Sequence, residues 1–359
     1  MTIHHKRIDE RIDWLLELAR RHTADFRNPE ACLARELYKA QHPTAIVVLK
    51  CMDGRINIPV VTSTPPGIIQ PFRNLGGMFD LGWPHLGEVL ASHIQRMVAD
   101  GRRVIIFITY HFSRGDAQRG CAGFNYDTAA AEAYTRTIKH QAEQIFGARR
   151  STVYPLICGF ETDEDALLLH GVDNQLLDLS TIAPEQTGSL GQRLSALYPD
   201  MPEQMHADLL PLLQGNLHWI SQVRKTCRLL EFEHREWMIC LGRGFDFLHT
   251  PNIALIIGPY SPDLADPIRK AAGIIEANMQ AGRIPDDGFL LFTSAPYDEI
   301  GVDQARAEQK SRFLASYAAE VIGRDFPKLA EKMRCKIAIL SWRSRELDIL
   351  PQQSAAAND

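Results

Sequence analysis

The sequence lacks the features that would assign it to a membrane, secreted or nucleic-acid-binding class. No run approaches the roughly 18 consecutive apolar residues that a membrane-spanning helix needs. Residues 1–7 have no apolar core behind them, so they do not resemble a secretory signal. The net charge is -5, and no basic stripe or alternation of aromatic and basic residues is present. We therefore expect a cytoplasmic protein with no membrane and no nucleic-acid partner.

Cysteine is scarce as well. The chain has 7 cysteines, which are scattered and odd in number. Most stand in apolar surroundings, which is typical of buried reduced thiols rather than of a disulfide framework. Cys51 and Cys121 are the exceptions, because both stand beside other residues with metal-binding or catalytic potential.

Strands alternate with helices along the first half of the chain. Hydrophobic residues make up 45% and charged residues 23%, as in an ordinary globular protein. Two helices are expected within 6–40, before the sheet, and another over 207–230. Between them the pattern predicts strands at 44–49, 68–72, 103–110 and 152–158, and helices at 84–99 and 127–146. This alternation favours an α/β fold with a mainly parallel sheet flanked by helices.

The second half of the chain repeats the first in a degenerate form. Residues 104–109 match 289–294 at an offset of 185, and the helix that follows matches at an offset of 176. The difference between the offsets falls between His111 and Cys121, so the second copy lacks that loop. Pro296 stands where His111 does, and the counterpart of the first strand, 237–243, has no Cys-x-Asp-x-Arg. We predict an internal duplication, a pseudo-dimer, in which only the first copy carries chemistry.

The strongest chemical signal follows the first predicted strand. Cys51, Asp53 and Arg55 form a Cys-x-Asp-x-Arg motif directly after an apolar run. Ligands bind at the carboxyl ends of strands in open α/β sheets. A thiolate there is a metal ligand or a nucleophile, and the Asp and Arg are close enough to pair. Gly76 and Gly77 allow a tight backbone beside the same edge.

Two further candidate ligands, His111 and Cys121, stand at and beyond the end of a later strand. Zinc takes thiolate and imidazole ligands in a tetrahedral site, and a catalytic site keeps one position open for water. We expect Cys51, His111 and Cys121 to bind one Zn²⁺ per chain. Cadmium or cobalt would suit the same ligands, whereas an iron–sulfur cluster is less suited because only three ligands are present.

These motifs give the chain a family resemblance. The Cys-x-Asp-x-Arg motif, then residues 72–77, then a strand leading into His111 and a later Cys121 resemble the β-class carbonic anhydrases over about residues 44–170. The fused, degenerate second copy and the long loop before Cys121 are similar to the carboxysomal branch of that superfamily. The long loop is also similar to that of the cadmium-using diatom branch.

The resemblance implies a carbonic anhydrase (carbonate dehydratase, a lyase) that hydrates CO2 reversibly to bicarbonate. Zinc held by Cys51, His111 and Cys121 would lower the pKa of its bound water from 15.7 to roughly 7, giving a hydroxide that attacks CO2. Asp53 would accept the hydroxide proton, and Arg55 would keep Asp53 ionised and oriented. Asp53 could also coordinate zinc in a resting state.

The sequence departs from the common family pattern in three places. Nine residues separate His111 from Cys121 where two are usual, Gly54 replaces the common serine, and Pro65 stands where plant-type members have glutamine. These departures bear on substrate and rate more than on metal binding.

Other functions stay open at this point. The same centre could hydrolyse the CO2 analogues COS or CS2. It could instead be a non-catalytic zinc or bicarbonate-binding site that Asp53 closes as fourth ligand. A further alternative is nucleophilic catalysis, with Cys51 as the nucleophile and His111 as its base. In that mechanism Cys121 would have no role. The sequence shows no clear proton shuttle, and Asp116 is a weak candidate for that role. The residues do not identify the biological pathway.

The predicted organisation has five parts: an N-terminal helical arm at 1–43, a metal-binding catalytic domain at 44–180, a connector and helix at 181–233, a degenerate repeat at 234–345, and a tail at 346–359. The arm could pair two molecules into a homo-oligomer. We expect the residues after 351 to be disordered.

Overall fold

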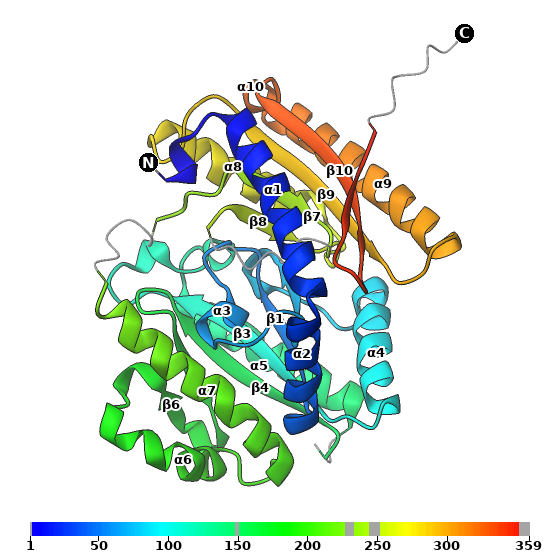
Figure 1. The fold of residues 1–359 in the computed structure, drawn as a ribbon. Helices are drawn as coiled ribbons and strands as arrows, with labels where there is room; N and C mark the ends of the chain where they lie inside the picture. Colours follow the sequence, from blue (N-terminus) through cyan, green and yellow to red (C-terminus); the bar gives the residue numbers. More distant parts are fainter. Residues whose placement is uncertain (1, 148–150, 227–232, 244–251, 352–359) are drawn as a thin grey trace. The chain divides into compact units, whose positions relative to one another are not determined.

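The computed structural model describes residues 2–147, 151–226, 233–243 and 252–351, and the chain divides into two compact units. The first-sheet unit consists of Leu33–Glu233 with Tyr260–Pro262. The second-sheet unit consists of Met1–Cys32, His234–Pro259 and Asp263–Asp359. Figure 1 shows the elements of each unit. The predicted tail beyond 351 and the end of the helix predicted over 207–230 lie outside the described residues.

The sheet of the first unit has six strands in the order β2-β1-β3-β4-β5-β6. The first four run parallel, and β5 and β6 are added antiparallel at one edge. This confirms the α/β fold with a mainly parallel sheet. The strands are β1 (Ala45–Cys51), β2 (Ile69–Asn74), β3 (Val104–Phe112), β4 (Val153–Glu161), β5 (Ala166–His170) and β6 (Leu176–Asp178).

Helices cover this sheet and make its central strands fully buried. Every residue of β1 is buried, and α5 packs against both β3 and β4. A strand that is buried on both faces must be apolar throughout, which is why β1 and β3 read as unbroken apolar runs. Lys50 is the exception in β1, and its ammonium group donates to the Ile56 carbonyl at 3.3 Å.

The helices of this unit match the predictions in part: α4 and α5 agree within one residue at each end, α7 spans 203–223 where 207–230 was predicted, and α3 and α6 were not predicted. They are α2 (Pro29–Gln41), whose first four residues belong to the second-sheet unit, α3 (Ile58–Val61), α4 (Pro84–Ala99), α5 (Thr128–Phe146), α6 (Leu190–Leu197) and α7 (Glu203–Val223). Short 3-10 turns lie between them at η2 (Leu75–Gly77), η3 (Ala117–Arg119), η4 (Ala122–Phe124), η5 (Val172–Asn174), η6 (Leu179–Thr181) and η7 (Pro184–Ser189).

The second unit repeats the strand order of the first. Its five strands lie in the order β8-β7-β9-β10-β11, four of them parallel and β11 antiparallel. This corresponds to β2-β1-β3-β4-β5, as the predicted duplication requires. Its elements are η1 (Ile3–His5), α1 (Ile8–Arg27), β7 (Met238–Leu241), β8 (Ala254–Ile257), α8 (Ala265–Gln280), β9 (Phe289–Tyr297), α9 (Val302–Asp325), α10 (Pro327–Ala330), β10 (Met333–Ser341) and β11 (Leu347–Leu350).

The strand registers identify equivalent positions in the two sheets. Phe112 lies opposite Glu161, and Tyr297 lies opposite Ser341. In the first sheet the amide of Thr162, the residue after Glu161, donates to the Phe112 carbonyl at 2.8 Å. In the second sheet the amide of Trp342, the residue after Ser341, donates to the Tyr297 carbonyl at the same distance. Pro296 therefore takes the place of His111 in the second sheet, as the sequence predicted.

Two segments differ from the sequence-based picture. The strand β11 lies inside the predicted tail, where its four residues pair with β10. Five apolar residues recur at helical spacing in the N-terminal helix α1. Ile8, Ile12, Leu15 and Ala19 are buried and Leu16 is half-buried, but the helix also buries Arg11, which pairs with Asp287. The structure contains no helix, among the residues that it describes, that is long and apolar enough to cross a membrane.

Asn216 joins α7 to the sheet. Its side chain is fully buried, accepts from the Leu167 amide at 2.9 Å, and donates to the carbonyls of Val61 and Asp165 at 3.2 and 2.8 Å. A buried backbone group that loses its only partner bears its full desolvation penalty. These bonds attach α7 to the turn that follows β4 and to the strand β5 after that turn.

We predict that Asn216→Ala lowers the free energy of unfolding by about 2–4 kcal/mol, because it leaves buried backbone groups unpaired. Urea denaturation measures this. Gln222→Ala, which alters an exposed side chain on the same helix, should change it by less than about 0.5 kcal/mol. Equal stability of the two variants would show that the Asn216 contacts contribute nothing.

Candidate metal centre

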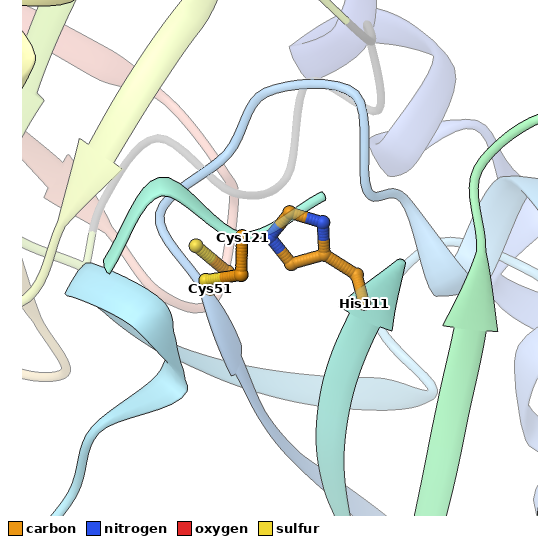
Figure 2. Close-up of side chains that lie close together, drawn as sticks. All are labelled: Cys51, His111 and Cys121. Carbon is orange, nitrogen blue, oxygen red and sulfur yellow. The ribbon is translucent and has the colours of Figure 1, made fainter. Parts of the chain in front are cut away.

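The three predicted ligands meet at the carboxyl edge of the first sheet. Cys51 is the last residue of β1, His111 lies one residue before the end of β3, and Cys121 lies between the η3 and η4 turns. Their ligating atoms all lie within 4.8 Å of one another. Figure 2 shows the imidazole directed towards the two sulfur atoms. The structure thus brings together residues that are as far as 70 positions apart in the sequence.

All three side chains are buried, with 6%, 1% and 3% of Cys51, His111 and Cys121 exposed. Neither ring nitrogen of His111 has a hydrogen-bond partner among the described residues. A buried imidazole without partners is costly, and a bound metal ion would satisfy one of its nitrogens. Two sulfurs and one imidazole nitrogen form a typical zinc donor set. The residues present therefore fit a zinc ion.

The two thiols are not equivalent. A hydrogen bond from the Cys51 thiol lowers the pKa of Cys121, against the effect of burial, and the Gly123 and Phe124 amides lower it further. The same bond to Cys121 and burial raise the pKa of Cys51 well above its usual range. Of the two thiols, Cys121 is therefore the more readily deprotonated. Because a metal ligand must be a thiolate, metal binding here is coupled to release of the Cys51 proton.

Asp53 and Arg55 form a buried ion pair beside the cluster. The Arg55 guanidinium donates to Asp53 Oδ1 at 3.0 Å and to Oδ2 at 2.6 Å, and the Arg55 amide donates to Oδ1 at 2.9 Å. Arg55 also donates to the Arg119 carbonyl at 3.0 Å. Asp53 Oδ2 lies 3.9 Å from His111 Nε2. The carboxylate is thus held at a fixed orientation next to the candidate ligands.

The neighbouring strand β2 supports this pair, a contribution that the sequence did not identify. The guanidinium of Arg73 donates to the Asp53 carbonyl at 3.0 Å, and the Met52 amide donates to the Asn74 carbonyl at 2.9 Å. Arg73 is only 4% exposed. The available signal was a charged residue directly after the strand predicted over 68–72, because such residues are rarely buried without a partner.

Three glycines allow the backbones around the centre to approach closely. Gly77 has φ +65°, and a Cβ there would lie 3.0 Å from the Thr109 carbonyl and 3.6 Å from the Cys51 amide nitrogen. This confirms the predicted tight backbone at Gly76 and Gly77. A Cβ on Gly123 would lie 2.7 Å from Gly76 Cα. Gly123, which the sequence analysis did not single out, thus lets the segment carrying Cys121 pack onto η2.

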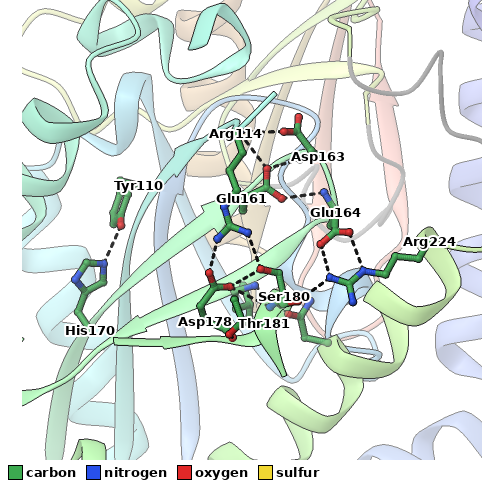
Figure 3. A network of polar contacts seen from close by, with 12 residues as sticks. Tyr110, Arg114, Glu161, Asp163, Glu164, His170, Asp178, Ser180, Thr181 and Arg224 are labelled. Carbon is green, nitrogen blue, oxygen red and sulfur yellow. Dashed lines mark hydrogen bonds and ion pairs between the residues drawn. The ribbon is translucent and has the colours of Figure 1, made fainter. Parts of the chain in front are cut away.

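A polar network follows β4, next to the strand that carries His111 (Figure 3). The Glu161 carboxylate accepts from the amides of Asp163 and Glu164 at 3.0 and 2.9 Å. Burial raises the pKa of Glu161 to about 7. Burial alone would also raise the pKa of Asp163, but hydrogen bonds from Gly115, Ser113 and neighbouring groups lower it overall. The pair therefore contains one readily protonated and one firmly ionised carboxyl group.

Comparison with known proteins gives a similarity to solved structures but not to families or curated sequences. No family model and no curated protein matches the sequence. Among solved structures, the β-carbonic anhydrase CcaA aligns with 47% of this chain and 92% of its own, at 16% sequence identity and a TM-score of 0.33. Similarity at this level does not assign the chain to a family.

The raised pKa of Glu161 predicts a pH dependence of stability. A carboxyl group that is protonated more readily in the folded state contributes stability that is fully present below its ordinary pKa and is lost as the pH rises through about 7. We expect the free energy of unfolding of the metal-free protein to fall by about 1–3 kcal/mol between pH 5 and 7.5 from this group.

Urea denaturation at several pH values, with a chelator present, measures the fall. Glu161→Gln should remove most of it, because the amide does not titrate. Glu164→Gln, a partly exposed neighbour that pairs with Arg224, should leave it in place. The same pH slope in Glu161→Gln and in the unchanged chain would contradict a protonated Glu161.

Proposed function

We propose that the protein is a zinc-dependent carbonic anhydrase that interconverts CO2 and bicarbonate. The observation that carries this proposal is the convergence of Cys51, His111 and Cys121 beside the Asp53–Arg55 ion pair. These three residues would hold one zinc ion, which as a Lewis acid makes a water molecule nucleophilic near neutral pH.

Asp53 is proposed to orient the attacking water. An ionised carboxylate has about four acceptor sites on its two oxygens, and Arg55 occupies sites on both of them. Oδ2, which lies 3.9 Å from His111 Nε2, would accept the hydrogen of the water and direct its lone pair towards the carbon of CO2. Because the carboxylate is held in place before the reaction, little reorganisation is needed during it.

Arg55 is proposed to keep Asp53 ionised and turned towards the centre. A bidentate guanidinium–carboxylate pair fixes geometry as well as charge. The carbonyl of Arg119 binds the same guanidinium, so the orientation of Asp53 is linked to the segment that precedes Cys121. The engagement of both Asp53 oxygens by Arg55 favours an open centre over one that Asp53 closes as a fourth ligand.

We predict that Asp53→Asn keeps zinc but lowers the rate of CO2 hydration about 10²–10⁴-fold, since the amide no longer provides an oriented anionic acceptor. Stopped-flow hydration on protein of known metal content tests this. Glu88→Gln, an exposed substitution on α4, should leave the rate unchanged. An undiminished rate in Asp53→Asn would rule out the proposed role of the pair.

We also predict that Cys51→Ala retains no zinc, because the remaining two ligands are too few for a stable site. Metal analysis after gel filtration measures the loss, with Cys158→Ala as the matched buried thiol outside the cluster. Zinc retained equally by both variants would place the metal elsewhere.

The hydration assay also separates the remaining functions. Rapid hydration with about one zinc per chain supports the carbonic anhydrase. A full zinc complement without CO2 hydration would redirect the proposal to COS or CS2, assayed on the same sample. Zinc without turnover of any of the three would indicate a structural or bicarbonate-binding centre.

A further inference from the structure

We propose that Asp163 is a positioning residue for the metal centre, because its carboxylate fixes the loop that brings Cys121 to Cys51 and His111. The inference rests on the proposed function, since it concerns the same ligands. Asp163 does not itself belong to the cluster. It follows β4 in the turn at residues 162–165, and we call residues 113–120 the ligand loop.

The ligand loop needs an anchor because it contains little regular structure. Apart from the single turn η3, none of its described residues belongs to a helix or strand. An unanchored loop would lose conformational entropy each time Cys121 joined the centre, which weakens metal binding. Contacts that hold the loop before the metal arrives avoid that loss.

Asp163 provides such contacts at the start of the loop. Its carboxylate accepts from Ser113 Oγ at 2.8 Å, from the Arg114 amide at 2.9 Å and from the Gly115 amide at 2.8 Å. Three consecutive residues are thus held by one ionised group, and bonds to an ionised acceptor are stronger than those between neutral groups. The guanidinium of Arg119 lies 3.9 Å from the same carboxylate.

The far end of the loop is tied to the centre itself. The Arg119 carbonyl accepts from Arg55, which holds Asp53, and Gly123 packs on Gly76 just after Cys121. Asp163 therefore fixes the end of the loop that these contacts do not reach.

Glu161 orients Asp163 towards the loop. It accepts the amides of Asp163 and Glu164, and it lies opposite Phe112 in the strand pairing, one residue beyond His111. The support for the ligand loop thus begins on β4, the strand that pairs with β3, which carries His111. This arrangement couples the positions of the two ligands.

The second sheet provides an internal comparison. By strand register, Ser341 replaces Glu161, and the following residues place Arg343 at the position of Asp163. The turn itself is conserved between the copies: Asp165 and Arg345 have φ values of 55° and 59°. The turn therefore forms without the acidic residues.

Only part of the local hydrogen bonding is replaced in that copy. Ser341 Oγ accepts from the Ser344 amide at 3.3 Å, as Glu161 accepts from Glu164. Arg343 cannot accept the amides that Asp163 accepts. In the second copy β9 ends at Tyr297 and α9 begins at Val302, so the counterpart of the ligand loop is missing as well. The loop and the carboxylate that holds it are absent together.

Metal binding by the full-length chain tests the proposal. Zinc affinity is measured by competition with a chromophoric chelator, and Co²⁺ binding by the thiolate-to-cobalt charge-transfer absorption, which reports the bound thiolates. We expect Asp163→Ala to bind zinc about 10–100-fold more weakly, as for other residues that support metal ligands. Its cobalt spectrum should lose the contribution of Cys121.

Asp178→Asn is the matched control. Asp178 binds the Arg114 side chain rather than the loop backbone, so the same loop loses one carboxylate contact without losing its anchor. Its zinc affinity should stay within about threefold of the unchanged chain. If Asp163→Ala fails to fold by circular dichroism, Asp163→Asn, which keeps the shape and one acceptor oxygen, takes its place with the same expected direction.

The outcomes separate this inference from the proposed function. An unchanged chain that binds metal through both thiolates, with Asp163 variants of equal affinity and spectrum, would overturn the inference alone. Equal losses in the Asp163 and Asp178 variants would also overturn it, because the effect would then be general to the loop. An unchanged chain that binds neither zinc nor cobalt would overturn the proposed function and this inference with it.

Discussion

The parallel pairing of β1 with β3 is the interaction on which the candidate centre depends. The register places Leu49 opposite Ile108, so Cys51 and His111 reach the same edge of the sheet although 60 positions separate them. Because both strands are buried on both faces, a shift of register would disrupt close packing of their apolar side chains on either side of the sheet. The hydrophobic core therefore sets the spacing of the two ligands, and the ligand loop only has to deliver Cys121.

Each acidic side chain that we describe at the buried carboxyl edge of the first sheet has a neighbouring group that compensates for its burial. Arg55 neutralises Asp53, hydrogen bonds from the Cys51 thiol and two amides lower the pKa of Cys121, and burial favours the protonated form of Glu161. A buried charge without such compensation would be strongly destabilising. The ring nitrogens of buried His111 have no hydrogen-bond partner among the described residues, as expected of a side chain that binds a ligand which the chain alone does not supply.

The sequence predicted those parts of the structure that local patterns determine. Apolar runs marked β1 and β3, helical periodicity marked α4, and a motif at a strand end marked Cys51 with Asp53 and Arg55. It did not identify Asp163 or Gly123, because their roles depend on contacts with residues distant in sequence. A polar turn is ordinarily solvated, and nothing local shows that Asp163 faces another loop. The strand β11 was assigned to the tail because four half-exposed residues form a strand only when β10 is present to pair with them.

The two sheets show that the fold and the chemistry are separable in this chain. They share the order and direction of five strands, yet only the first has Cys51, His111 and the ligand loop. A repeated scaffold can keep its topology while its ligands are replaced. Core packing determines the topology, whereas a few residues at strand ends supply the ligands. The equivalent turns make the same point at smaller scale: the backbone at Asp165 and Arg345 is alike, while the side chains have exchanged acids for bases. What distinguishes the first sheet is therefore the set of polar contacts at one edge, and its function must be tested there.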